Sequence, residues 1–317
     1  MGNKMTRRNK EKDDISKDAA AKQLRKAGVL LDEGLELMEH QDYVKACERF
    51  AEARAIYSEN GLEDKCAHCD VQTGIALTSL NRYEAALELF TKAREAFEME
   101  IDTQAVADCD QNMAVVYKEM GKYEKSLELY LSARSAYEAG GNPVKAATCD
   151  MNTAVAYRHI GQYEPAETLL LSAKDLFEQS GLDLQVARCD QNLANIYIHQ
   201  NGLKKAKNIL ESARDVFKAN SQPLSAADCE TNLANIYNLM KDPKTAIRTV
   251  TLARKVYESN NVPVSLAKSS LCMAQSYISL KQNDKAYELL GLAKEIYDAK
   301  GLEEFAHICE KEMSKLQ

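Results

Sequence analysis

Side-chain amides recur at a fixed interval along this chain, and an amide can bind a peptide main chain. The stretch CDQNLANIY begins at Cys189, and the similar stretch CETNLANIY begins 40 residues later at Cys229. An asparagine amide offers a donor and an acceptor, which suits the N–H and C=O groups of an extended peptide. Asparagine is a poor residue for a helix interior, so its repetition needs a reason. The column reads Asp32, Gln72, Asn112, Asn152, Asn192, Asn232 and Cys272.

Carboxylates recur at the same interval and raise the question of acid–base catalysis. The acids are spaced one per interval and are not clustered, which argues against an active site. A basic residue stands 16 residues before each acid, and the midpoint of Arg94 and Asp110 lies in a predicted turn. Positions equidistant from an antiparallel turn face each other, so we expect ion pairs between consecutive helices. The expected pairs are Arg54–Asp70, Arg94–Asp110, Arg134–Asp150, Lys174–Asp190, Arg214–Glu230 and Lys294–Glu310.

The cysteines suggest a metal site at one place only. CAHC, residues 66–69, supplies two thiols and an imidazole, whereas a structural zinc takes four ligands and no second C-x-x-C is present. Cys69 also belongs to a cysteine column on an apolar stripe, where a small sulfur side chain fills a helix contact. We therefore expect core thiols, no metal and no cofactor. No P-loop or G-x-S-x-G motif is found, so the sequence indicates no catalytic residues and no enzyme.

Composition and charge narrow the class of protein. The 317 residues are 45% hydrophobic and 28% charged, which is typical of a soluble globular chain. No apolar run is long enough to span a membrane, and no secretory signal is visible, so free thiols in a reducing cytoplasm are expected. Residues 1–27 carry a net charge of +5 and the remainder −12, for a total of −7. The acidic body argues against nucleic acid as a partner.

From Leu31 the chain divides into seven rows of 40 residues without a gap. Such a period predicts a solenoid of stacked helical units. In the third row an apolar stripe runs from Cys109 to Met120 at helical spacing, Gly121-Lys122 ends it, and Tyr123 starts a second stripe. No strand-like alternation is present, so the predicted class is all-α. One column is always alanine: Ala53, Ala93, Ala133, Ala173, Ala213, Ala253 and Ala293.

Residues 112–137, NMAVVYKEMGKYEKSLELYLSARSAY, resemble a tetratricopeptide repeat, with Ala114, Tyr117 and a glycine turn at the family's spacings. The resemblance covers about 30–317 and implies a right-handed α-solenoid of about seven helix pairs, with a C-terminal capping helix over 303–315. The period of 40 rather than about 34 is similar to that of kinesin light chain and spindle-adaptor arrays. We expect a basic, partly disordered N-terminal arm over 1–27 and the repeat solenoid over 28–317.

In the geometry that this resemblance implies, the asparagine column faces the concave groove, where peptide-binding members hold a ligand's main chain. The alternative is that the amides hydrogen-bond neighbouring helices and stiffen the array. Asp108 and Asp228 alternate with Arg188 and Lys268 one turn before the column, and these mixed signs argue against a clamp for a terminal carboxylate. The residues expected to contact the ligand are Asn112, Asn152, Asn192, Asn195, Asn232, Asn235, Gln275, Arg188, His159 and His199.

The first residues, MGNKMTRR, fit the M-G-x-x-x-[ST] pattern for myristoylation at Gly2. One acyl chain anchors weakly, and the basic residues that follow could supply the second membrane signal. Peripheral membrane contact through residues 2–12 is one reading of this segment. The other is a solvated basic segment.

The main function hypothesis is a non-catalytic, cytoplasmic adaptor or scaffold whose concave groove binds a peptide segment of a partner protein. One alternative is a regulatory sensor of a short free peptide. Receptors of that kind usually carry an effector region before the repeats, and 27 residues are too few for one. A second alternative is a scaffold anchored to a membrane through a myristoylated Gly2.

Overall fold

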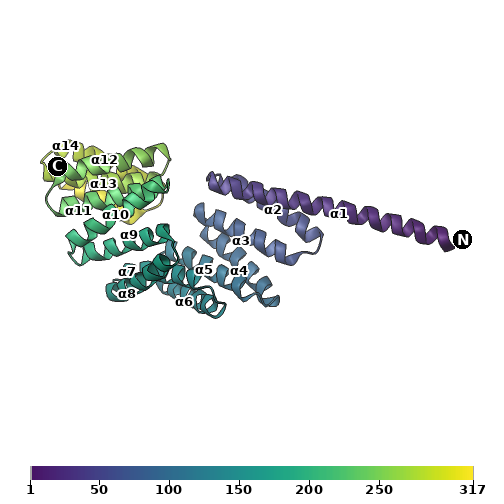
Figure 1. The fold of residues 1–317 in the computed structure, drawn as a ribbon. Coiled ribbons are helices and arrows are strands. Elements are labelled where there is room, and N and C mark those ends of the chain that lie inside the picture. The colour runs from purple at the N-terminus through teal and green to yellow at the C-terminus, as the bar shows by residue number, and fades with distance from the viewer. Residues whose placement is uncertain (1, 317) are drawn as a thin grey trace. The chain divides into compact units, whose positions relative to one another are not determined.

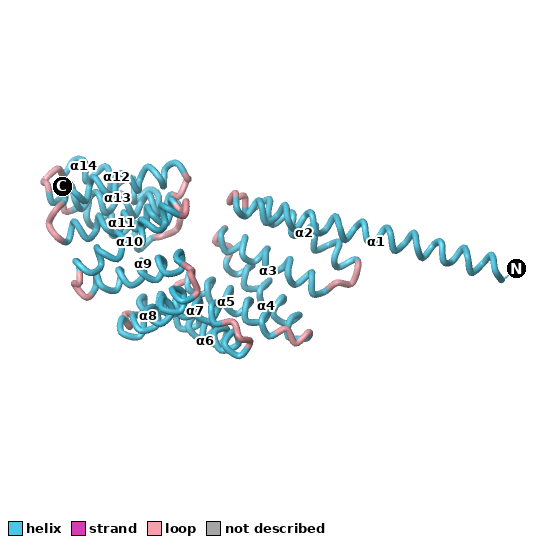
Figure 2. The backbone as a smooth tube through the Cα atoms, in the orientation of Figure 1, coloured by secondary structure: helices cyan, strands magenta, loops and turns pink. Residues whose placement is uncertain are grey.

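The computed structural model describes the backbone of residues 2–316 and the side chains of residues 20–316. Over this part the chain forms 15 helices and no strand (Figures 1 and 2). The predicted all-α class, the seven sequential helix pairs and the capping helix are confirmed. The helices are α1 Gly2–Glu39, α2 Tyr43–Glu59, α3 Glu63–Ser79, α4 Tyr83–Met99, α5 Thr103–Glu119, α6 Tyr123–Ala139, α7 Pro143–His159, α8 Tyr163–Gln179, α9 Asp183–His199, α10 Leu203–Ala219, α11 Pro223–Leu239, α12 Pro243–Ser259, α13 Pro263–Ser279, α14 Asn283–Ala299 and α15 Glu303–Ser314.

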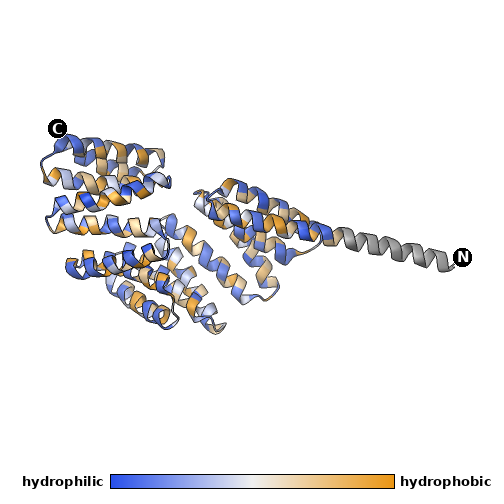
Figure 3. Ribbon diagram, turned by 45° about the horizontal axis from the view of Figure 1, so that its top comes forward, coloured by the Kyte–Doolittle hydropathy of each residue, from blue (hydrophilic) through white to orange (hydrophobic). Residues whose placement is uncertain are grey.

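The helices group into two compact units. Unit 1 spans Met1–Gln162 and holds α1 to α7, and unit 2 spans Tyr163–Gln317 and holds α8 to α15. Within each unit consecutive helices pack on each other, and hydrophobic residues alternate with polar ones along the helices coloured in Figure 3. Helix α1 continues through position 27 without a break. The division into an arm over 1–27 and an array over 28–317 therefore stays a prediction.

Each turn places its second residue in the left-handed region, which ends one helix and redirects the chain. At Gly141 φ is +69°, and the N–H of Asn142 closes the turn by donating to the Tyr137 carbonyl at 2.8 Å. Asn142 then caps α7 by accepting from the Lys145 N–H at 3.2 Å, and Pro143 occupies the first turn of that helix. Local sequence therefore sets the helix boundaries.

The core consists of small residues facing large ones. Every member of the alanine column is at most 1% exposed. Phe90 of α4 faces Gly74 of α3. A Cβ added at position 74 would lie 2.7 Å from the nearest atom of the Phe90 ring. Farther along the chain alanine takes the glycine's place, as at Ala274, which lies in one core cluster with Leu290. The contact between α3 and α4 is thus close enough to favour glycine at position 74.

Four of the six expected ion pairs form. Arg54–Asp70, Arg94–Asp110, Arg134–Asp150 and Lys174–Asp190 each have an N–O distance of 2.6 Å. Burial raises the pKa of Asp150 and Asp190, although the basic partner lowers it in each case.

The Arg214–Glu230 and Lys294–Glu310 predictions are wrong. Glu230 pairs at 2.6 Å with Lys218, one helical turn after Arg214 on the same face, and Arg214 turns to Asp215. Lys294 pairs at 2.8 Å within its own helix with Asp298. Position along two consecutive helices brings the columns together, and at these two places a charge one turn away takes one of the expected partners.

Candidate functional site

A pocket of about 160 Å³ lies between α11 and α13 in unit 2. It brings together three of the residues predicted to contact a ligand, Asn232, Asn235 and Gln275, with Lys268 at the exposed edge. Thr231, Leu271 and Cys272 complete the lining. We call this set the amide pocket.

Asn232 is the unusual residue of the amide pocket. It is only 8% exposed, and its side-chain amide has no hydrogen-bond partner within the described part of the chain. Both polar atoms of the amide remain accessible from the pocket. Its neighbour Thr231 differs, because the Thr231 hydroxyl lies 3.1 Å from the Tyr257 hydroxyl and donates to the Ala227 carbonyl. The protein therefore satisfies Thr231 and leaves Asn232 open to the pocket.

A different asparagine braces the two helices. The Asn238 amide donates to the Cys272 carbonyl at 3.0 Å and accepts from the Ser276 hydroxyl at 2.7 Å, which links α11 to α13. Asn235, one turn before it, makes no such bond among the described residues. Internal bracing, the alternative explanation for the amides, is thus carried by Asn238, which sequence reasoning did not single out.

The remaining predicted residues lie outside the amide pocket. Asn112 and Asn152 lie on α5 and α7 of unit 1, and Asn192 and Asn195 lie on α9 of unit 2; all four are half-buried. No side-chain hydrogen bond to these four amides occurs within residues 20–316. Arg188, also on α9, is exposed.

The two histidines lie at helix ends, stacked on tyrosines. His159 stacks on Tyr123 with ring centroids 4.8 Å apart, and His199 stacks on Tyr163 at 5.1 Å. Burial lowers the pKa of His159, with smaller effects from Arg158 and Lys118, which keeps the stacked ring neutral at pH 7. Each stack joins the last residue of one helix to the first residue of the helix before it, and neither histidine lines the amide pocket.

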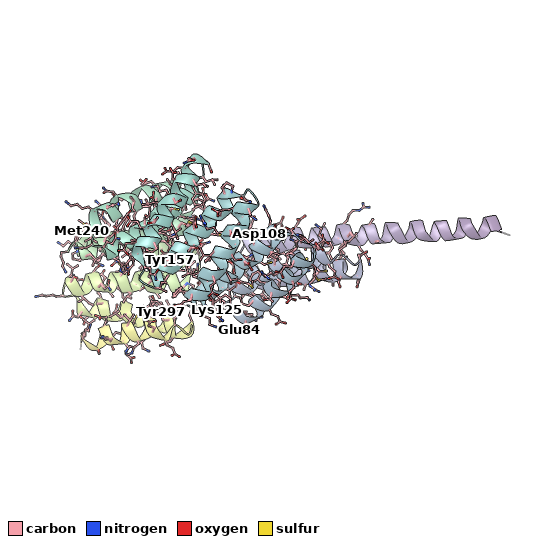
Figure 4. All side chains as sticks on the ribbon, turned by 90° about the horizontal axis from the view of Figure 1, so that it is seen from below. Glu84, Asp108, Lys125, Tyr157, Met240 and Tyr297 are labelled. Carbon is pink, nitrogen blue, oxygen red and sulfur yellow. The ribbon has the colours of Figure 1, made fainter. Side chains whose placement is uncertain are left out.

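Asp108 and Asp228 each accept a hydrogen bond from a tyrosine hydroxyl and do not line the amide pocket. The Tyr257 hydroxyl donates to Asp228 at 2.7 Å, and the Tyr137 hydroxyl donates to Asp108 (labelled in Figure 4) at 2.5 Å. Burial raises the pKa of Asp228, although the Tyr257 hydrogen bond and Lys268 lower it. The signal was visible in the sequence, because each of these acids stands 29 residues before a tyrosine of the aromatic column.

The thiols behave as core residues. Cys66 and Cys69 are buried, and burial raises the pKa of Cys69 to about 12. Among the described residues no group of three His, Cys, Asp or Glu side chains is placed to hold a metal ion. No helix in the same part of the chain is both long and apolar enough to cross a membrane. The predicted lipid site at Gly2 and the membrane segment over 2–12 lie outside the residues whose side chains are described.

Two family descriptions match parts of the chain. The tetratricopeptide repeat matches residues 103–179, and the soluble NSF attachment protein, SNAP, matches residues 14–135. No curated protein matches the chain in sequence.

Solved structures share the fold at low sequence identity. Aspartyl phosphate phosphatase F from Bacillus subtilis matches with a TM-score of 0.73 and 15% identity, over 89% of this chain and 72% of the other. The apo quorum sensor NprR from B. thuringiensis matches with a TM-score of 0.70 and 19% identity, over 90% and 81%. The Rap conjugation gene regulator of plasmid pLS20, in complex with the Phr* peptide, matches with a TM-score of 0.63 and 14% identity, over 92% and 96%.

Proposed function

We propose that this chain, which matches the tetratricopeptide repeat over residues 103–179, is a regulatory sensor that binds a short extended peptide in the amide pocket. The observation that carries the proposal is the amide of Asn232, which lines the pocket and makes no hydrogen bond among the described residues, although the residue as a whole is only 8% exposed. A peptide main chain placed there supplies an acceptor and a donor for this amide. Asn235 and Gln275 offer the same chemistry to the next peptide groups.

The choice of a sensor over an adaptor rests on the comparisons. One similar structure is described as a quorum sensor and another as a regulator in complex with a peptide. The chain covers 96% of the peptide-bound regulator. The expectation that a peptide sensor needs a separate effector region before the repeats therefore does not weigh against this function. The adaptor hypothesis shares the site and differs only in whether the peptide is free or part of a protein.

The proposal is one of binding rather than catalysis. The one thiol of the amide pocket, Cys272, has its pKa raised to about 12 by burial, so it stays protonated at pH 7. At 15% identity the likeness to the phosphatase is one of fold, as it is for the quorum sensor and the regulator, whose likeness supports the proposal only together with the amide pocket. Lys268 at the edge of the pocket favours a peptide with an acidic residue beside the segment that the amides hold.

The test uses a displayed library of random heptapeptides selected on the full chain. Selected peptides are synthesised, and their Kd is measured by fluorescence polarisation for wild type, Asn232→Ala, Asn235→Ala and Asn238→Ala. Asn232→Ala and Asn235→Ala should each weaken binding by about 1–3 kcal/mol without lowering stability. Asn238→Ala should lower the melting temperature and leave Kd nearly unchanged.

Two results would contradict the proposal. One is that Asn232→Ala destabilises the fold while peptides bind as before, since the amide would then be structural. The other is that the selection enriches no peptide whose affinity depends on Asn232 or Asn235.

A further inference from the structure

The turn between α4 and α5 holds an isoleucine in a conformation that suits glycine. Ile101 has φ +60°, a region that a β-branched side chain strongly disfavours. Four other turns place glycine at this column: Gly61, Gly141, Gly181 and Gly301. Ile101 is 83% exposed and its neighbour Met99 is 86% exposed. The fold thus gains no burial from Ile101 in return for its strain, which points to a role outside folding.

Ile101 lies at one end of a groove in unit 1. Helix α4 forms one wall, α6 the other and α5 the floor. A cavity of about 280 Å³ beside Ile101 and another of about 430 Å³ nearer Lys125 (labelled in Figure 4) share the lining residues Arg94, Asp110 and Ser132. The two cavities therefore form one groove, crossed at its middle by the Arg94–Asp110 ion pair.

Two small side chains of α6, Ser132 and Ala136, line the groove at positions where some other repeats carry leucine or isoleucine. Ser132 stands in the column that holds Leu252 and Leu292, and Ala136 stands in the column that holds Leu176 and Ile296. The Ser132 hydroxyl donates to Asp110 at 3.0 Å, so the acid is held from both walls. The lining is largely apolar on either side of this bridge, with Val106 and Ala107 toward Ile101 and Met113 and Leu129 toward Lys125.

Charge at the Ile101 end indicates what fits the groove. Glu98, Glu100 and Asp102 surround the exposed Met99 and Ile101. Of these three acids only Glu98 forms an ion pair among the described residues, with Arg94 at an N–O distance of 2.7 Å. Apolar side chains ringed by acids suit a partner that carries apolar residues beside a base. They do not suit an anionic lipid surface, which these acids would repel.

We propose that the groove between α4 and α6 docks a segment of a partner protein that carries two apolar side chains, one for each cavity, flanked by a lysine or arginine. From Thr103 to Tyr117 the floor helix extends about 21 Å at 1.5 Å per residue. This length matches about six residues of extended chain. The site is separate from the amide pocket, which lies in unit 2, and does not depend on the peptide-sensing function.

The probe is a displayed library of random dodecapeptides selected on the full chain, after phage that bind an Ala136→Leu bait have been removed. Ile101→Gly introduces the residue that four other turns carry at this position, and Ala136→Leu introduces the residue found at position 176. Both variants should therefore fold, with unchanged or higher melting temperatures. Synthetic peptides from the selection should carry the apolar and basic pattern. Each variant should weaken their Kd by about tenfold or more. The double variant Asn232→Ala, Asn235→Ala should bind them as wild type does.

Three outcomes would overturn the docking site. The selection could enrich no peptide over background. The enriched peptides could bind Ile101→Gly and Ala136→Leu as tightly as wild type, or lose affinity only in the double amide variant. Finally, vesicles of phosphatidylcholine and phosphatidylserine could bind wild type and not Ile101→Gly, which would make Met99 and Ile101 a lipid contact instead. A failure of peptide binding at the amide pocket alone leaves the groove result unchanged.

Discussion

Replacing Gly74 by alanine tests whether the helices of unit 1 pack as closely as the repeat columns require. A Cβ at position 74 would lie 2.7 Å from Cε1 and 2.8 Å from Cζ of Phe90. Phe90 is 1% exposed, so its ring has little space to move into. We expect the crowding to cost about 1–3 kcal/mol. The better helix propensity of alanine returns about 1 kcal/mol, so Gly74→Ala should lower stability by up to about 2 kcal/mol.

Gly291 is the matched control. It lies inside α14, and a Cβ added there would meet no atom within 4 Å. Gly291→Ala should therefore raise stability by about 1 kcal/mol through helix propensity alone. Thermal and urea unfolding followed by circular dichroism would measure both variants. A change of 1 kcal/mol shifts the melting temperature by about 2–4 °C for a unit of this size.

A second substitution should rescue the first. In the last repeat Ala274 and Leu290 occupy the positions of Gly74 and Phe90, and they lie in one core cluster. Phe90→Leu should therefore make room for alanine at position 74. Alone, Phe90→Leu should cost about 1 kcal/mol of apolar burial, and the double variant should be more stable than the sum of the two single changes. If Gly74→Ala stabilises as much as Gly291→Ala, or if the two changes add without coupling, the close contact between α3 and α4 is refuted.

Two further predictions concern buried charge. Because burial raises the folded-state pKa of Asp228 above its ordinary value of 3.8, its stabilising contribution is complete below pH 3.8 and is lost as pH rises through the raised pKa. In urea unfolding at a series of pH values, Asp228→Asn should become more stable relative to wild type as pH rises through that pKa. If the variant became less stable relative to wild type instead, the direction of the pKa shift would be contradicted. Asp110→Ala should cost about 1–3 kcal/mol, because it strips Arg94 and Ser132 of a buried partner. Glu310→Ala should cost at most about 1 kcal/mol, since Glu310 is 65% exposed. Equal melting shifts for these two variants would show that the ion pair at Asp110 adds nothing.

Most of the fold follows from the sequence because each repeat is built from local decisions. The 40-residue columns, the left-handed turn residues and the prolines at the first helical turn set the helix boundaries. An ion pair such as Arg94–Asp110 is also predictable, because its partners lie on two consecutive helices at equal distance from one turn. At Glu230 a second base, Lys218, stands one turn after Arg214 and forms the pair instead, which spacing alone does not predict.

The candidate site depended on contacts between helices that are not neighbours in sequence. The asparagine column drew attention to Asn232, but only the packing of α11 on α13 places its unpaired amide in a pocket and gives the bracing role to Asn238. The groove between α4 and α6 likewise depends on how three helices pack, with two small side chains of α6 in its lining. The sequence by itself determined the helices, their order and which columns are apolar, because these depend on residues close in the chain. Only the tertiary structure decided which polar groups stay unpaired and which surfaces stay open, because burial and hydrogen bonding depend on atoms that other helices supply.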